Sequence, residues 1–337
     1  MEKPIVRISV RNLVEFILRN GDLESGGTAG DKEAMLKGSR LHRKIQKQMG
    51  SHYQAEVSLK KDTEYEDLIL RVEGRADGIF TQNEKICIDE IKGVYKNLEL
   101  LAEPVLVHRA QALCYAWIYL DDHGLEEIDV QMTYAHLDTE MIKRFRETMT
   151  REELESWYQR LLDSYHKWLS YQMKWREERN RSMEKLEFPF IYRKGQKEMV
   201  AGIYHAISRK EQIFIQAPTG VGKTMSAVFP AVRSIGEGKA ETLFYLTART
   251  ITRTVAQDAF EILRKNGLLF KTVTITAKEK LCFCEKPECN PETCPYAKGH
   301  YDRINDAVYE LWTNEQSFDR ETILRQAEKW QVCPVEM

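Results

Sequence analysis

The segment from Ile213 to Thr224 constrains the fold of this chain more than any other. Three apolar residues, Ile213–Ile215, precede the glycine-rich run Ala217–Thr224, and a helical pattern follows. A buried strand, a glycine-rich loop and a helix in this order form a phosphate-binding loop. Gly220 and Gly222 let backbone N–H groups turn toward phosphate oxygens, and the helix adds its positive end.

Two further residues complete the prediction of a nucleoside triphosphate site. Lys223 is placed to reach the β- and γ-phosphates of ATP, and the hydroxyl of Thr224 is placed to ligate Mg²⁺. Ala217 stands where the usual pattern has its first glycine, and a small residue still fits there. The alternative is a glycine-rich turn that opens an unrelated helix, but the apolar strand before the loop favours the phosphate site.

Length and composition are typical of a soluble globular protein with two or three domains. The chain has 337 residues, 42% hydrophobic and 30% charged. Because the formal net charge is −2, contacts to a nucleic acid would depend on local basic patches. No apolar run approaches the length of a membrane span, and the N-terminus lacks a signal-peptide pattern. The sequence therefore predicts a cytoplasmic protein with no membrane partner, and it leaves the oligomeric state open.

The N-terminal part of the chain alternates between helical and strand patterns. A short helix is predicted at 9–20, where apolar residues recur at helical spacing. The following pattern predicts the order helix, three strands, helix, strand, at residues 33–49, 53–60, 68–80, 85–91, 103–120 and 128–137. The second and third of these strands are joined by a turn signal at 81–84, so we expect a hairpin there.

Acidic and basic residues with suggestive spacing lie on this hairpin. Asp77 lies near the end of its first strand, and Glu90 and Lys92 lie two residues apart on its second strand. Residues two apart on a strand project from the same face, and the hairpin brings Asp77 beside it. Two carboxylates there could hold Mg²⁺ or Mn²⁺, and Lys92 could stabilise charge on a scissile phosphate. On the next helix, Gln111 and Tyr115 share one face.

This pattern resembles the RecB-like nucleases of the PD-(D/E)xK superfamily over about residues 33–138. The resemblance implies that the metal ligands are His42, Asp77 and Glu90 and that Lys92 is the catalytic lysine. It also implies that Gln111 and Tyr115 form a Q-x-x-x-Y helix motif that lies along DNA. Asp89 and Glu90 are adjacent, and strand alternation favours Glu90, because Asp89 should point to the opposite face.

Each of these residues also has an ordinary structural explanation. Asp77 can simply end a strand, and Glu90 with Lys92 can form a surface ion pair worth about 0–1 kcal/mol. A lone histidine such as His42 is more often a satisfied structural residue. The joint pattern favours the nuclease, and an inactive nuclease-like domain that binds DNA is the main alternative.

A long amphipathic helix is predicted at 151–181, with its tryptophans in the core. Pro189 marks a break, so we place a domain boundary at 183–189. The next helical segment begins at Gln196, upstream of the phosphate loop. This position resembles the upstream element of superfamily 2 helicases, in which a glutamine reads the adenine.

A strand is predicted at 242–247, after the phosphate loop, and a helix follows it. Thr and Arg residues at the carboxyl end of a parallel strand suit phosphate contacts along a single strand. This element resembles motif Ia of superfamily 2 helicases, which implies that Thr247, Arg249 and Thr250 contact DNA. An ordinary surface helix is the alternative.

Five of the seven cysteines lie between Cys282 and Cys333, which favours a metal or cluster site over disulfides in a chain without a secretion signal. Their spacing lacks the paired C-x-x-C units of zinc ribbons and is compatible with an iron–sulfur cluster. We predict that the ligands of a 4Fe–4S cluster are Cys282, Cys289, Cys294 and Cys333. Cys284 is left as a spare, and zinc or structural thiols are the alternatives.

The cysteines follow the motif Ia-like element, as in the XPD/DinG branch of DNA helicases, which this arrangement resembles. There a cluster domain interrupts the first motor domain. No Asp-Glu box follows the phosphate loop, so we expect the N-terminal part of a longer protein. The predicted chain is α/β and has three parts. Residues 1–185 form a PD-(D/E)xK nuclease-like α-β-β-β-α-β domain, and residues 186–281 form a partial RecA-like P-loop motor domain. Residues 282–337 form a Cys-rich cluster insertion.

The sequence therefore predicts a hydrolase, the front part of an ATP-dependent DNA helicase–nuclease. Its predicted cofactors are ATP, Mg²⁺ or Mn²⁺ and a 4Fe–4S cluster, and its predicted partner is single-stranded or branched DNA. The resemblance implies 5′ to 3′ movement and a role in DNA repair. Two alternatives stay open: a helicase whose nuclease-like domain only guides DNA, and a non-catalytic, cluster-dependent DNA-binding module.

Overall fold

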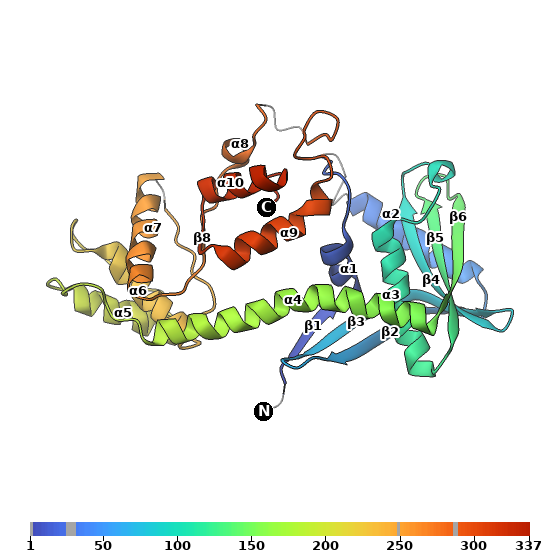
Figure 1. The fold of residues 1–337 in the computed structure, drawn as a ribbon, viewed down its shortest axis with the longest axis horizontal. Coiled ribbons are helices and arrows are strands. Elements are labelled where there is room, and N and C mark those ends of the chain that lie inside the picture. The colour runs from blue at the N-terminus through green and yellow to red at the C-terminus, as the bar shows by residue number, and fades with distance from the viewer. Residues whose placement is uncertain (1–2, 25–31, 248–249, 286–288) are drawn as a thin grey trace. The chain divides into compact units, whose positions relative to one another are not determined.

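The computed structural model describes residues 3–24, 32–247, 250–285 and 289–337 (Figure 1). The chain divides into two units, made up of Met1–Trp168, Leu281–Tyr309 and Gln326–Met337 in unit 1, and of Leu169–Lys280 and Glu310–Arg325 in unit 2. Within the described ranges, no helix has both the length and the apolar composition that a membrane span requires.

Unit 1 is built on a mixed six-stranded sheet. Its strands are β1 (Ile5–Ser9), β2 (Gln54–Glu64), β3 (Ile69–Gln82), β4 (Lys85–Val94), β5 (Glu127–His136) and β6 (Ile142–Thr150). The order across the sheet is β1-β3-β4-β5-β6, and β2 pairs with β3. The β3–β4 and β5–β6 pairs are antiparallel, whereas β4 and β5 are parallel.

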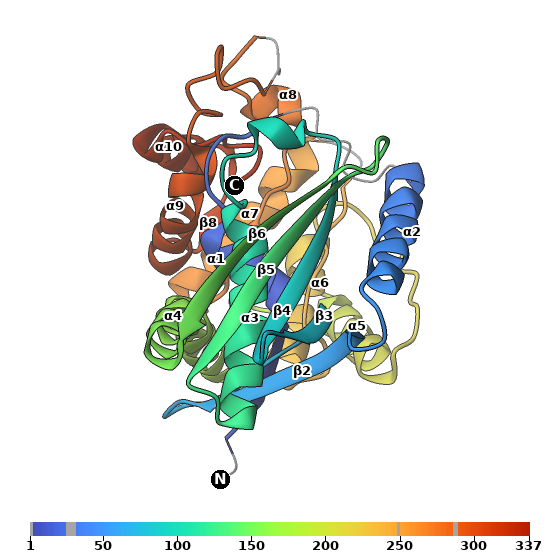
Figure 2. The ribbon, with the colours of Figure 1, turned by 90° about the vertical axis from the view of Figure 1, so that its right-hand side faces the viewer.

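Helices cover both faces of this sheet. They are α1 (Val10–Leu18), α2 (Lys32–Gln48), the short 3₁₀ helix η1 (Leu98–Leu100), α3 (Leu106–His123) and the first part of α4 (Arg151–Glu184). The parallel strands β4 and β5 need a crossover connection, and α3 provides it. Figure 2 shows α3 behind β4 and β5. Helix α2 packs on the opposite face of β4, where Leu41 and Ile45 contact Ile91.

The predicted order helix, three strands, helix, strand is confirmed by α2, β2, β3, β4, α3 and β5. The sequence analysis did not predict β1 and β6. Strand β6 alternates half-buried and exposed residues and is mostly polar, so it carries no apolar stripe that would identify it. Its place is set by antiparallel pairing with β5 along the whole strand.

The cysteine-rich segment of unit 1 is joined to the N-terminal part of the same unit. The backbone N–H of Leu23 donates to Ala297 O at 2.8 Å, and that of Tyr301 donates to Gly21 O at 2.9 Å. Leu23 also packs in one hydrophobic core with Cys294. The helices of the C-terminal region are α8 (Lys278–Leu281), α9 (His300–Asn314) and α10 (Arg320–Trp330). The two backbone hydrogen bonds and the shared core anchor the cysteine-rich segment to the residues that follow α1.

Unit 2 is mainly helical. Its elements include α5 (Gln196–Arg209), α6 (Lys223–Gly236), α7 (Thr250–Lys265) and the short parallel pair β7 (Thr272–Val273) and β8 (Ser317–Phe318). Val228 and Val232 of α6 and Leu263 of α7 are fully buried in its core. The amphipathic faces of α6 and α7 therefore hold this unit together.

Two segments of unit 2 differ from the prediction. Residues 213–215 and 242–247 were predicted as strands, and neither is a strand in this structure. Phe214 is 94% exposed and Leu246 is 88% exposed. A strand is stabilised by backbone hydrogen bonds to a neighbour, and no strand in the described part of the chain pairs with either segment. The apolar pattern alone was therefore insufficient to predict a strand in either segment.

Candidate functional site

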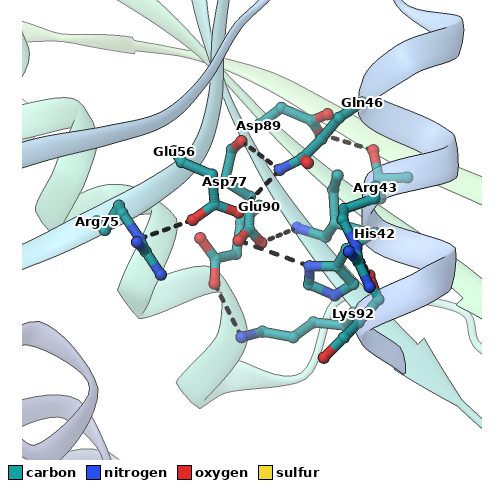
Figure 3. A network of polar contacts seen from close by, with 12 residues as sticks. His42, Arg43, Gln46, Glu56, Arg75, Asp77, Asp89, Glu90 and Lys92 are labelled. Carbon is teal, nitrogen blue, oxygen red and sulfur yellow. Dashed lines mark hydrogen bonds and ion pairs between the residues drawn. The ribbon is translucent and has the colours of Figure 1, made fainter. Parts of the chain in front are cut away.

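The hairpin of β3 and β4 places two carboxylates side by side (Figure 3). Asp77 and Glu90 lie next to the paired residues Gly78 and Asp89. Asp77 Oδ2 accepts a hydrogen bond of 2.7 Å from the backbone N–H of Ile91. This bond reaches across the hairpin and fixes the Asp77 carboxylate beside Glu90.

Glu90 is a buried carboxylate with one unused oxygen. Its side-chain Oε1 accepts from Lys92 Nζ at 2.8 Å, whereas Oε2 is buried and has no hydrogen-bond partner among the described residues. Burial raises the pKa of Glu90 to about 7; the Lys92 charge opposes this shift, and the neighbouring Asp77 charge adds to it. Such an oxygen is suited to a cation, because an unsatisfied buried acceptor is costly.

The ammonium of Lys92 is held by two acceptors from different elements. In addition to Glu90 on its own strand, Lys92 Nζ donates to Gln111 Oε1 of α3 at 2.6 Å. Gln111 is only 4% exposed, so this amide is fixed by packing. Lys92 is thereby oriented toward the carboxylates rather than toward open solvent.

Helix α2 closes the other side of the carboxylate pair. His42 Nδ1 lies 3.7 Å from Asp77 Oδ1. Gln46, one turn further along α2, donates to the backbone oxygen of Asp77 at 3.0 Å and to Glu56 Oε1 at 3.1 Å. These bonds hold α2 against β2 and β3 and bring His42 to the site.

Tyr115 lies deeper in the molecule than a DNA-contacting residue needs to be. It is 6% exposed, and the backbone N–H of Arg75 donates to its hydroxyl. A Cβ atom at Gly74 would lie 2.7 Å from that hydroxyl oxygen, so the ring needs glycine at this point of β3. The contact positions α3 on the sheet, and a role of Tyr115 along DNA stays a prediction.

Asp89 points away from this site, as strand alternation predicts. Its carboxylate accepts from Thr133 Oγ1 at 2.6 Å and from the Tyr53 hydroxyl at 3.1 Å. Asp89 is completely buried, and burial raises its pKa. It belongs to a polar network on the α2 side of the sheet, and Glu90 is the residue that faces Lys92.

The described residues contain no group of three or more His, Cys, Asp or Glu side chains that could hold a metal ion. The three predicted ligands, His42, Asp77 and Glu90, therefore do not form a complete metal cage. The smaller set of Asp77 and Glu90 fits Mg²⁺, which keeps several waters and binds proteins through one or two carboxylates. The unpartnered Oε2 of Glu90 supports this fit.

A pocket of about 410 Å³ lies beside Lys92. Besides His42, Lys92 and Gln111, it is lined by Arg11 of α1 and His108 of α3. His108 shares a helix face with Gln111 at a spacing of three residues, and the sequence analysis gave it no role. Arg11 lies far from these residues in sequence, so no local pattern could have identified it.

In unit 2, the phosphate loop has the backbone that its glycines predict. Gly220 and Gly222 have φ values of +84° and +81°, in the left-handed region that favours glycine. Gly222 is the N-cap residue of α6. Lys223 Nζ donates to Ala217 O at 2.8 Å and to Pro218 O at 3.1 Å. The lysine thus lies over the loop, at the place where a phosphate would compete for it.

Gln196 is packed against this loop. It is buried, and its Oε1 accepts from the backbone N–H of Arg193 at 3.0 Å. The guanidinium of Arg193 in turn donates to Gly220 O. A Cβ atom at Gly222 would lie 2.6 Å from Gln196 Nε2. The Thr224 hydroxyl lies 3.5 Å from that of Tyr245. The structure thus brings the predicted ATP-binding residues together.

The predicted DNA-contacting residues are only partly described. Thr247 is exposed at the end of segment 242–247, which has no regular secondary structure. Arg249 and the side chain of Thr250 lie outside the described residues. Their contact with nucleic acid stays a prediction.

The cysteines of the C-terminal segment lie together in unit 1, and no disulfide joins the described cysteines. Buried Cys294 and Cys333 share a core with Cys284 and Cys289, and Cys284 Sγ lies 3.7 Å from Cys294 Sγ. Cys282 interacts with Cys284. Cys284, the predicted spare, therefore belongs to this group of cysteines. The described thiols form no metal-binding group.

Comparisons with known proteins give a family match for part of the chain. No curated protein matches the chain. Among solved structures, the chain is similar to one titled "Crystal structure of SSO0001", with 18% identity and a TM-score of 0.33 over 46% of this chain and 75% of that chain. Residues 193–289 match the family model of the DEAD/DEAH box helicases, which implies ATP hydrolysis, use of Mg²⁺ and nucleic-acid binding. This match, which includes the phosphate loop and Gln196, supports a superfamily 2 helicase with its DEAD/DEAH box domain at residues 193–289.

Proposed function

We propose that unit 1 is a metal-dependent DNA nuclease that works together with the DEAD/DEAH box helicase domain. The observation that carries this proposal is the buried, unpartnered Oε2 of Glu90 beside Asp77, with the Lys92 ammonium held at the same carboxylate. The Lys92 ion pair uses only Oε1, so this buried acceptor is left for another ligand. The helicase activity would move the enzyme from 5′ to 3′ along DNA during repair.

Asp77 and Glu90 would hold Mg²⁺ or Mn²⁺ together with water, and His42 lies beside Asp77. When bound, the metal would polarise the scissile phosphate and make its bound water more acidic. Lys92 would stabilise the negative charge that develops on the phosphate. Gln111 would keep the lysine directed at that phosphate through its hydrogen bond of 2.6 Å.

In the helicase domain, the backbone N–H groups around Gly220 and Gly222 would bind the phosphates of ATP. Lys223 would exchange its bonds to the loop carbonyls for bonds to phosphate oxygens. Thr224 would ligate Mg²⁺, and Gln196 would read the adenine. Thr247 with the neighbouring Arg249 and Thr250 would contact the DNA backbone.

A 4Fe–4S cluster on Cys282, Cys289, Cys294 and Cys333 is a separate prediction. The convergence of several cysteines in one core supports this prediction. The described residues contain no formed metal-binding group, and this observation does not support it. Iron, zinc and acid-labile sulfide measured on protein purified without oxygen would decide. Iron with equimolar sulfide indicates a cluster, zinc alone indicates a structural zinc site, and neither indicates structural thiols.

The nuclease is tested with single-stranded and flapped DNA and Mn²⁺, comparing the chain with Lys92→Ala. We expect the substitution to reduce cleavage by about 100-fold or more, because it removes a charge at the reacting phosphate. Lys96→Ala is the matched control, since Lys96 is exposed just beyond the same strand. DNA binding without cleavage by any of these proteins would show that unit 1 only guides DNA.

A further inference from the structure

The pocket beside Lys92 has a second group of polar side chains that the proposed cleavage chemistry does not use. Arg11 and Glu15 of α1, Ser39 of α2 and His108 of α3 line it, and Lys92 forms its boundary with the carboxylate site. Four elements of unit 1 thus meet around one cavity. Its residues are placed by the fold and not by a single sequence motif.

The hydrogen bonds of His108 define which of its ring nitrogens carries the proton. The buried Tyr134 hydroxyl accepts from the backbone N–H of Val105 at 2.9 Å, and it lies 3.2 Å from His108 Nδ1. A buried hydroxyl proton needs an acceptor, and Nδ1 is the one that the described contacts provide. Tyr134 therefore donates to Nδ1.

A neutral His108 must then carry its proton on Nε2. Burial, together with the nearby charges of Lys92 and Arg11, lowers the pKa of His108 to about 4, so the ring is neutral at physiological pH. With Nδ1 occupied by Tyr134, the Nε2–H group is the donor that His108 offers to the pocket.

The charges around the pocket favour an anion. Arg11 and Lys92 are cationic, and Glu15 is the one carboxylate in the described lining. Arg11 Nε donates to Glu15 at 2.8 Å, but both side chains are exposed. Because such an exposed pair is worth only about 0–1 kcal/mol, the guanidinium can turn to a stronger anionic partner.

We propose that this pocket is a phosphate subsite, in which the Nε2–H of His108 and the guanidinium of Arg11 bind a phosphate group of the DNA strand beside the one that is cleaved. A neutral N–H donor and a guanidinium together match the acceptors of one phosphodiester. The proposal deepens the nuclease function and rests on it for the position relative to the cleaved bond. It predicts how the strand is held, independently of the cleavage step.

The test uses two substitutions that separate the two ring nitrogens. His108→Asn keeps an acceptor near Nδ1 for Tyr134 but removes the donor at Nε2, whereas His108→Gln places an amide N–H near the Nε2 position. Binding of a short fluorescent single-stranded oligonucleotide to the full chain is measured in EDTA, so that no cleavage is needed. Melting temperatures equal to that of the unmodified protein show that the variants are folded.

We expect His108→Asn and Arg11→Ala each to weaken DNA binding by about 10-fold, and His108→Gln to retain most of the affinity. A set of oligonucleotides carrying one uncharged methylphosphonate at successive positions locates the bound phosphate. At the position that occupies the subsite, the methylphosphonate should weaken binding to the unmodified protein and have no further effect on His108→Asn.

Three results would overturn the subsite: unchanged affinity in Arg11→Ala and His108→Asn, equal losses in His108→Asn and His108→Gln, or methylphosphonate effects that simply add to those of the variants. Comparing 5′-phosphorylated with 5′-hydroxyl oligonucleotides distinguishes a terminal phosphate from an internal one, and a purely terminal effect would contradict the position proposed. The nuclease function is read separately, from cleavage of unmodified DNA with Mn²⁺. Binding effects without any cleavage would therefore reject the nuclease and keep the phosphate site.

Discussion

The side-chain oxygen of Gln111 lies 2.6 Å from the ammonium of Lys92, and it joins a helix to the strand that carries the candidate active site. Gln111 comes from α3, which connects β4 to β5, so the crossover helix itself supplies a partner for the lysine. The contact is buried on the side of Gln111. The position of Lys92 therefore depends on how α3 packs on the sheet.

Gln111→Met should lower the rate of DNA cleavage about 10-fold, because Lys92 loses one acceptor and its ammonium is less well oriented. Methionine has a similar length, so packing of α3 is retained. The rate is measured with saturating DNA and a single turnover. Gln48→Met at the exposed end of α2 is the control. An unchanged rate in Gln111→Met would show that Glu90 alone positions the lysine.

Two glycine substitutions in unit 1 should have opposite effects on stability. Gly74→Ala places a Cβ atom 2.7 Å from the Tyr115 hydroxyl, which should destabilise the protein by about 1–3 kcal/mol. Gly38→Ala meets no atom within 4 Å and lies inside α2, where alanine should stabilise by about 0.5–1 kcal/mol. Melting temperatures of the two variants check the pair. Equal effects would mean that Tyr115 moves freely away from β3.

Stability should depend on the protonation of His108 in mildly acidic solution. The pKa of His108 is lowered from 6.5 to about 4 in the folded protein, so the unfolded chain binds the proton first as the pH falls. The stability contributed by the neutral ring is fully present above pH 6.5 and is lost as the pH falls toward 4, in total about 3 kcal/mol. Lys92 and Arg11 are the charges that face the ring, and Tyr134 is its partner.

Melting temperatures measured from pH 7 to pH 4 test this prediction. The unmodified protein should lose more stability over this range than His108→Asn, which cannot take up the proton. Subtracting one curve from the other cancels the effect on melting temperature of the carboxylates that titrate in both proteins. Parallel curves would contradict a neutral, buried His108.

Nucleotide binding by unit 2 should depend on Lys223. Lys223→Ala should weaken binding of Mg²⁺-ATP more than about 10-fold, because a charged hydrogen bond to phosphate is lost. Lys265→Ala is the control, since Lys265 is exposed at the end of α7. Binding is measured by isothermal titration calorimetry. Equal affinities in the two variants would show that the loop does not bind the phosphates.

The features that the sequence determined are those that depend on neighbouring residues. The left-handed backbone at Gly220 and Gly222 follows from glycine in a loop of a few residues. The order of helices and strands around the hairpin follows from hydrophobic periodicity, and strand alternation separates Glu90 from Asp89. Each of these is a local property of the chain, because it is set by residues within one or two turns or along one strand.

The tertiary structure decided what depends on partners far away in the sequence. Residues 213–215 are apolar, yet they form no strand. A strand needs a neighbouring strand for its backbone hydrogen bonds, and no strand among the described residues pairs with this segment. Mostly polar β6 is a strand because β5 lies beside it. Arg11 comes close to His108 only because α1 and α3 pack together in the folded protein. The charges and hydrogen bonds of a site depend on such distances between elements, and local sequence patterns do not encode them.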